Sequence, residues 1–68
     1  MKTVRITAEE LWAGDKLEVK QGSIRKYYAL CEVHVRYDAF VGVTVVYIDH
    51  GQFVRKTFGL DDKVRVRE

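Results

Sequence analysis

The sequence predicts an all-β fold, a small barrel of about five to six antiparallel strands with one short helical turn near the N-terminus. Apolar and polar residues alternate along most of the chain, which is the period of a strand with one buried face. Turn-forming residues interrupt this alternation at short intervals. The chain has 68 residues, which is enough for one domain with one core, and curling so small a sheet removes most of its open edges.

The first elements are a short strand and a helical turn. Val4 and Ile6 alternate with polar neighbours, as in a strand. Thr7 and Glu10 have the spacing of a capping box, which predicts a single helical turn between them. Residues 12–15 read Trp-Ala-Gly-Asp, a turn signal that ends it.

A second, half-buried strand is predicted around Leu17 and Val19. Charged residues alternate with these two and face water: Lys16, Glu18 and Lys20. Residues 21–23, Gln-Gly-Ser, then turn the chain.

Residues 24–36 have the pattern of one strand that is longer than strands usually are. In a protein of this size such a strand must bend and serve two sheets. Strand parity predicts an inward row, which is Tyr27, Ala29, Cys31, Val33, Val35 and Tyr37. It predicts an outward row of Glu32, His34 and Arg36.

The residue pattern of the C-terminal half predicts three more strands. Residues 43–48 are apolar on both faces, which favours a central strand. Residues 49–52 have the composition of a tight hairpin turn in which Gly51 supplies a positive φ, and residues 53–58 form the return strand. After a turn, the last strand has Val64 and Val66 inward, with Arg65 and Arg67 outward.

The segments TAEELWAGDKLEV (7–19) and GQFVRKTFGLDDKV (51–64) resemble a small SH3-like barrel of the kind found in KOW-type domains and in the N-terminal domain of elongation factor P. That resemblance implies an SH3-like barrel over most of the chain. The family works through a lysine at the tip of a hairpin that contains glycine and proline. The equivalent loop here reads YDAFVG (37–42), without lysine or proline, so the resemblance carries over no functional residue. The chain also resembles phage or mobile-element proteins, which implies binding to a host protein.

Composition excludes several classes of function. Cys31 is the single cysteine, so it can form no internal disulfide, and a zinc ribbon, which needs several such ligands, is excluded. A lone free cysteine suits a reducing compartment, so we expect a cytoplasmic protein. No apolar run is long enough to span a bilayer. Cys31 and His34 are three residues apart and so fall on opposite faces of a strand, which argues against a nucleophilic pair. We expect no enzyme, no cofactor, no metal site and no small-molecule substrate.

Binding of nucleic acid, either RNA or single-stranded DNA, is one functional hypothesis. Small barrels can stack bases on aromatic side chains and hold phosphates with flanking cations. The candidates are Arg25, Lys26, Tyr28, Arg36 and Arg55. The formal net charge is only +2 with mixed signs along the chain, so the short basic clusters are also explained by a solvated surface.

Binding of a protein partner, or of a second copy, is the function that the sequence favours. Trp12 and Phe40 fall in turn regions, where large apolar groups are hard to bury, and Tyr37 begins the same loop as Phe40. Trp, Tyr and Arg are the usual anchors of interfaces. The alternative for Trp12 is that it covers the open end of the barrel.

Overall fold

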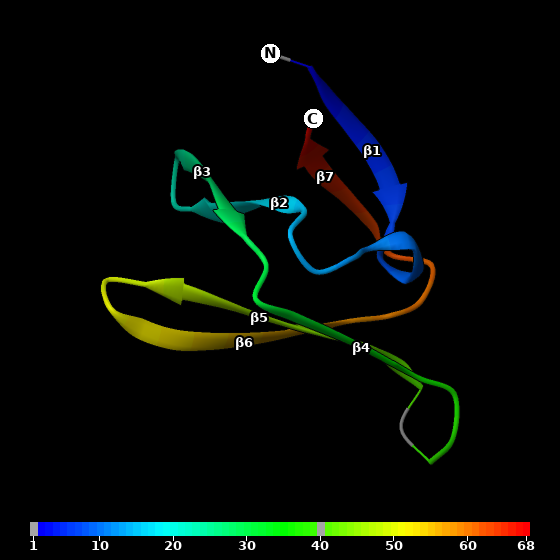
Figure 1. Cartoon of the computed structure of the whole chain (residues 1–68). Coiled ribbons are helices and arrows are strands. Elements are labelled where there is room, and N and C mark those ends of the chain that lie inside the picture. The colour runs from blue at the N-terminus through cyan, green and yellow to red at the C-terminus, as the bar shows by residue number, and fades with distance from the viewer. Residues whose placement is uncertain (1, 40) are drawn as a thin grey trace.

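Two antiparallel sheets make up the computed structural model, which describes residues 2–39 and 41–68 (Figure 1). One sheet has four strands in the order β1-β7-β2-β3, and the other has three in the order β4-β5-β6. The strands are β1 (Thr3–Thr7), β2 (Lys16–Gln21), β3 (Ile24–Ala29), β4 (Glu32–Arg36), β5 (Gly42–Asp49), β6 (Gln52–Phe58) and β7 (Lys63–Arg67). A 3₁₀ turn, η1 (Ala8–Glu10), follows β1. The predicted all-β class and the predicted helical turn are both confirmed.

The predicted closure into a barrel is wrong. Within the described residues, no ladder of hydrogen-bonded strands joins one sheet to the other, and β1, β3, β4 and β6 each pair along one edge only. The sheets lie as two layers in Figure 1, with β1 and β7 crossing above β5 and β6. Closing the sheet would require a longer continuous strand through the corner between β3 and β4, and the chain breaks there instead.

The corner lies at Leu30 and Cys31. The Leu30 N–H donates to the carbonyl of Asp15 at 2.9 Å, and the Leu30 carbonyl accepts from the Gly14 N–H at 2.8 Å. The Cys31 N–H donates to the carbonyl of Val46, at 2.7 Å, on the other sheet. The prediction that this stretch bends and serves both sheets is therefore confirmed, but it forms two strands where the sequence predicted one.

The corner also changes which side chains face inward. In β4 the prediction is confirmed, because Val33 and Val35 pack against the core. In β3 it is wrong, because Tyr28 packs on the core, whereas Tyr27 and Ala29 lie opposite the outward Glu18 and Lys16. Cys31, which follows β3 at the corner, was also predicted inward and is exposed. The buried Leu30 and the inward Val33 are three residues apart, so the extra residue at the corner shifts the alternation by one. Tyr37, also predicted inward, is exposed as well.

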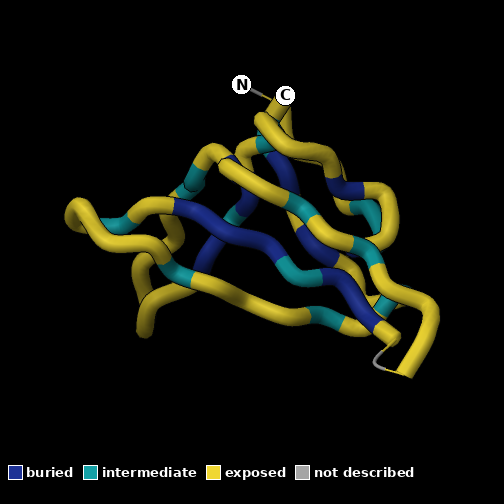
Figure 2. The backbone as a smooth tube through the Cα atoms, turned by 60° about the horizontal axis from the view of Figure 1, so that its bottom comes forward, coloured by how far each residue is buried: buried dark blue, intermediate teal, exposed yellow. Residues whose placement is uncertain are grey.

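The core fills the space between the sheets. Strand β5 contributes most to it and is buried over most of its length (dark blue in Figure 2). The buried cluster is Ala8, Leu11, Leu17, Val19, Leu30, Val43, Val45, Tyr47, Val64 and Val66. The rings of Tyr28 and Tyr47 stack across the sheets with centroids 4.7 Å apart.

Two turns have the chemistry that the sequence predicted. Glu10 Oε1 accepts hydrogen bonds from the backbone N–H of Thr7, at 3.1 Å, and from its hydroxyl, at 2.8 Å. These bonds lower the pKa of Glu10. In the β5–β6 hairpin both His50 (φ 52°) and Gly51 (φ 76°) have positive φ, as the two central residues of a type I′ turn require.

Candidate functional site

The outer face of the four-stranded sheet carries most of the positive charge of the protein. Inward and outward side chains alternate along each of its strands, and the inward positions are taken by core residues such as Leu17 and Val66. The outward positions bring seven basic residues together: Arg5, Lys16, Lys20, Arg25, Lys63, Arg65 and Arg67. Glu18 is the one acid at the outward strand positions, all of which the structure describes. We call this surface the basic face.

The basic face is strongly positive, although the net charge of the whole chain is small. Seven cations and one carboxylate give it a formal charge of +6, so the rest of the chain carries −4 of the net +2. Within residues 2–39 and 41–68, no ion pair joins any of the seven cations to an acid. A one-signed surface of this kind attracts anions over the range of a Debye length.

Strand pairing sets like charges against each other on the basic face. Arg5 lies directly opposite Arg65 in the β1–β7 ladder, and Lys20 lies opposite Arg25 in the β2–β3 ladder. Like charges at such positions destabilise a sheet. A bound anion would relieve this repulsion. A shallow hollow of about 220 Å³ lies among these side chains, lined by Arg5, Glu18, Lys20, Arg25, Lys63, Val64 and Arg65.

The aromatic residue of the basic face is already engaged. The hydroxyl of Tyr27 donates to Glu18 Oε2 at 3.0 Å, and the guanidinium of Arg67 lies 4.9 Å from the centre of its ring. Partial desolvation, followed by this bond to a carboxylate, raises the pKa of Tyr27. Its ring is therefore poorly placed to stack on a ligand.

The basic and aromatic candidates from the sequence do not come together. Arg25 belongs to the basic face. Lys26 lies opposite the buried Val19, on the core side of β3, although Lys26 itself is exposed. Tyr28 is on that same side and stacks on Tyr47.

The remaining candidates lie elsewhere. Arg36 and Arg55 are on the outer face of the three-stranded sheet, where Arg36 pairs with Asp38 at 3.5 Å. Tyr37 follows β4 and contacts Glu9, and Trp12 lies in the turn after η1. Phe40 lies outside the described residues.

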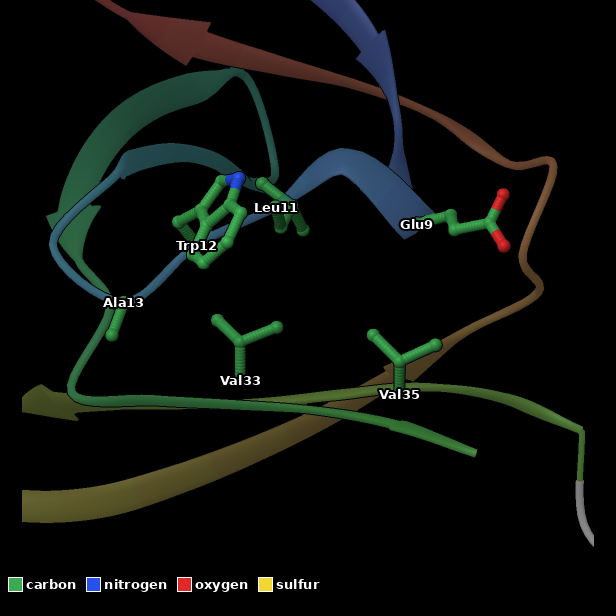
Figure 3. Close-up of a pocket in the computed structure, with 6 residues that line it drawn as sticks. All are labelled: Glu9, Leu11, Trp12, Ala13, Val33 and Val35. Carbon is green, nitrogen blue, oxygen red and sulfur yellow. The ribbon is translucent and has the colours of Figure 1, made fainter. Parts of the chain in front are cut away.

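A second feature is an apolar groove on the open side between the sheets (Figure 3). It has a volume of about 340 Å³, and its lining residues are Glu9, Leu11, Trp12, Ala13, Val33 and Val35. Val33 and Val35 rise from β4 to form its floor, and the turn after η1 forms the opposite wall. The groove exists because the sheets do not close at this edge.

Trp12 is held at the rim of the groove by its own turn. Asp15 Oδ2 accepts from the Trp12 N–H at 2.9 Å, and Gly14 takes a φ of 96°. The side chain of Trp12 is 76% exposed. The alternative that Trp12 covers the end of the core is therefore not supported, because the buried Leu11 takes that place.

One end of the groove is charged. Glu9 lies beside Val35, and its Oε2 accepts a 2.6 Å hydrogen bond from the hydroxyl of Tyr37. This bond is the main cause that raises the pKa of Tyr37. It also fixes the Glu9 carboxylate at the mouth of an otherwise apolar groove.

No group of three or more His, Cys, Asp and Glu side chains in the described part of the chain is placed to hold a metal ion. None of the described residues belongs to a helix with the length and apolar character that a membrane crossing requires. No protein-family model, curated protein or solved structure matches the chain.

Proposed function

We propose that the protein binds nucleic acid through the basic face, by contacts to the phosphate backbone. The observation that carries this proposal is the gathering of seven Lys and Arg side chains from four strands on one surface with a single carboxylate. Phosphate contacts supply most of the affinity of sequence-independent binding, and they require cations that no neighbouring acid neutralises.

The same face argues against base stacking as the source of affinity. Barrels that prefer single strands stack successive bases on exposed aromatic rings. Tyr27 is the aromatic residue at the outward strand positions of the four-stranded sheet. Its hydroxyl is bonded to Glu18, and the guanidinium of Arg67 lies over its ring. We therefore expect single-stranded and double-stranded nucleic acid to bind with similar affinity and little sequence preference.

A pair of charge-matched variants tests this function. Arg5→Gln with Arg65→Gln removes two facing cations from the basic face, and Arg36→Gln with Arg55→Gln removes two from the other sheet. Fluorescence anisotropy with a labelled duplex at low salt should show the first variant binding about tenfold more weakly. The second should bind within about twofold of the unmodified protein, because its arginines lie away from the phosphates.

Two results would count against nucleic-acid binding. The unmodified protein would show no binding at low salt, or both double variants would lose affinity equally. The second result would mean that net charge alone, and not the basic face, attracts the probe.

Binding of a protein partner is a second candidate function, with the apolar groove as its site. The observation that favours it is Trp12, which is 76% exposed at the rim of a groove with an apolar floor. Exposed Trp side chains are frequent anchors of interfaces. A library of random peptides of strand length tests this function. Peptides are selected for binding to the unmodified protein, and those that also bind the Trp12→Ala variant are removed. Phe53→Ala is the matched control, because Phe53 is 75% exposed but lines neither hollow.

The SH3-like fold is part of the same proposal. A 3₁₀ turn early in the chain, a bent segment shared by two sheets and a terminal strand beside the first strand support it. The protein would then be an opened form of such a barrel, with its groove at the open edge.

A further inference from the structure

Among residues 2–39 and 41–68, no strand pairs with the edge of β4 that lies beside the apolar groove. Strand β4 pairs with β5 on one side only, while Val33 and Val35 direct their side chains from β4 into the groove. An edge strand offers backbone N–H and C=O groups to another strand, and pockets beside it select the alternate side chains of that strand. The edge of β4 and the groove therefore form one continuous surface for an extended peptide.

The two ends of the groove differ in chemistry. Val33 lies beneath the indole of Trp12, so this end suits an apolar side chain (Figure 3). Val35 lies beneath Glu9, whose carboxylate is fixed by Tyr37. A carboxylate at the mouth of an apolar groove is best matched by a Lys or Arg, whose aliphatic stem contacts the valine while its charge reaches the acid.

Strand geometry fixes the spacing between these two side chains. Val33 and Val35 are two residues apart on one face of β4. A peptide strand paired with β4 has the same period, so the side chains that it directs into the groove are also two residues apart. The requirement holds for either direction of the peptide, because the spacing is symmetric.

We infer that the groove takes an extended segment of a partner protein, added as a strand at the free edge of β4. The segment carries an apolar residue over Val33 beneath Trp12, and a Lys or Arg two residues away that pairs with Glu9. This inference rests on the protein-binding function proposed for Trp12 and names the class of partner.

The peptide library described above tests the inference by its enriched motif. The expected result is enrichment of peptides with an apolar residue and a Lys or Arg separated by one residue. Replacing that Lys or Arg by Gln in one enriched peptide should weaken binding roughly three- to fivefold. The same replacement should have little effect on binding to the Glu9→Gln variant, because the pairing carboxylate is gone. Peptide binding should shift the backbone NMR signals of β4.

Each other outcome overturns the inference in a distinguishable way. Peptides that require Trp12 but lack this spacing would leave the protein-binding function in place and remove the motif. A library without any Trp12-dependent peptide would remove both. Concentration-dependent self-association through β4, which peptides do not reverse, would show that a second copy occupies the edge.

Discussion

At the scale of single residues, the structure raises the pKa of every tyrosine. Desolvation is the main cause for Tyr27, Tyr28 and Tyr47, and the bond to Glu9 is the main cause for Tyr37. Tyr28 is also held by Asp49, whose Oδ1 accepts its hydroxyl at 3.0 Å. Each of these environments favours the protonated phenol over the tyrosinate.

The raised tyrosine pKa values predict a loss of stability in alkali. The folded protein binds the phenolic protons more tightly than the unfolded chain, so their contribution is complete below the ordinary tyrosine pKa of about 10 and is lost as the pH rises through the folded values. Tyrosinate absorbance should titrate above the range of free tyrosine. Tyr37→Phe should remove one late-titrating group and reduce the alkaline loss in urea unfolding. Titration of all the phenols at the ordinary value would contradict this prediction.

At the scale of elements, the β1–β7 ladder holds a like-charge pair that costs stability. Arg5 faces Arg65 directly, and the cost of such a pair is about 0.2–1 kcal/mol. Arg65→Gln should therefore raise the free energy of unfolding by roughly 0.5 kcal/mol at low salt, measured by urea denaturation. The gain should fade at high salt, where the repulsion is screened.

Arg55→Gln is the control for this stability change. Arg55 lies opposite Val46 and faces no cation across its strand pair, so its removal should leave the stability nearly unchanged. An equal gain in both variants would show that overall charge, and not the pairing of β1 with β7, accounts for the effect. A loss of stability in Arg65→Gln would show that its side chain makes favourable contacts instead.

Local patterns predicted the elements well, because each depends on a few neighbouring residues. The capping spacing of Thr7 and Glu10 and the positive φ of Gly51 are chemistry that a sequence displays directly. The corner at Leu30 was not predictable in this way. Its position is set by backbone bonds to Asp15 and Val46, which are distant in sequence, and one extra residue there reverses the facing of Cys31.

At the scale of the whole molecule, strand order decides which charges share a face. The outward facing of Lys16, Lys20, Arg65 and Arg67 was predictable from alternation alone. Their union with Arg5 and Arg25 was not, because it requires β7 to lie between β1 and β2. The small net charge gives no sign of the basic face, because strand order brings the cations onto one side of the molecule.

The apolar groove is likewise a property of the whole molecule. Its two walls come from segments about 20 residues apart in the chain. The sequence indicated Trp12 as an exposed anchor, but Val33 and Val35 appeared only as core residues. They line the groove because the sheets stay open at the edge of β4.

The salt dependence of duplex binding shows whether the basic face contacts phosphates. The logarithm of the binding constant should fall linearly with the logarithm of salt concentration, with a slope of about −0.9 per phosphate contacted. The slope for Arg5→Gln with Arg65→Gln should be shallower by about 2, because two contacts are lost, and the slope for Arg36→Gln with Arg55→Gln should be unchanged. Binding that does not respond to salt, or equal changes of slope in both variants, would show that the basic face does not bind phosphates.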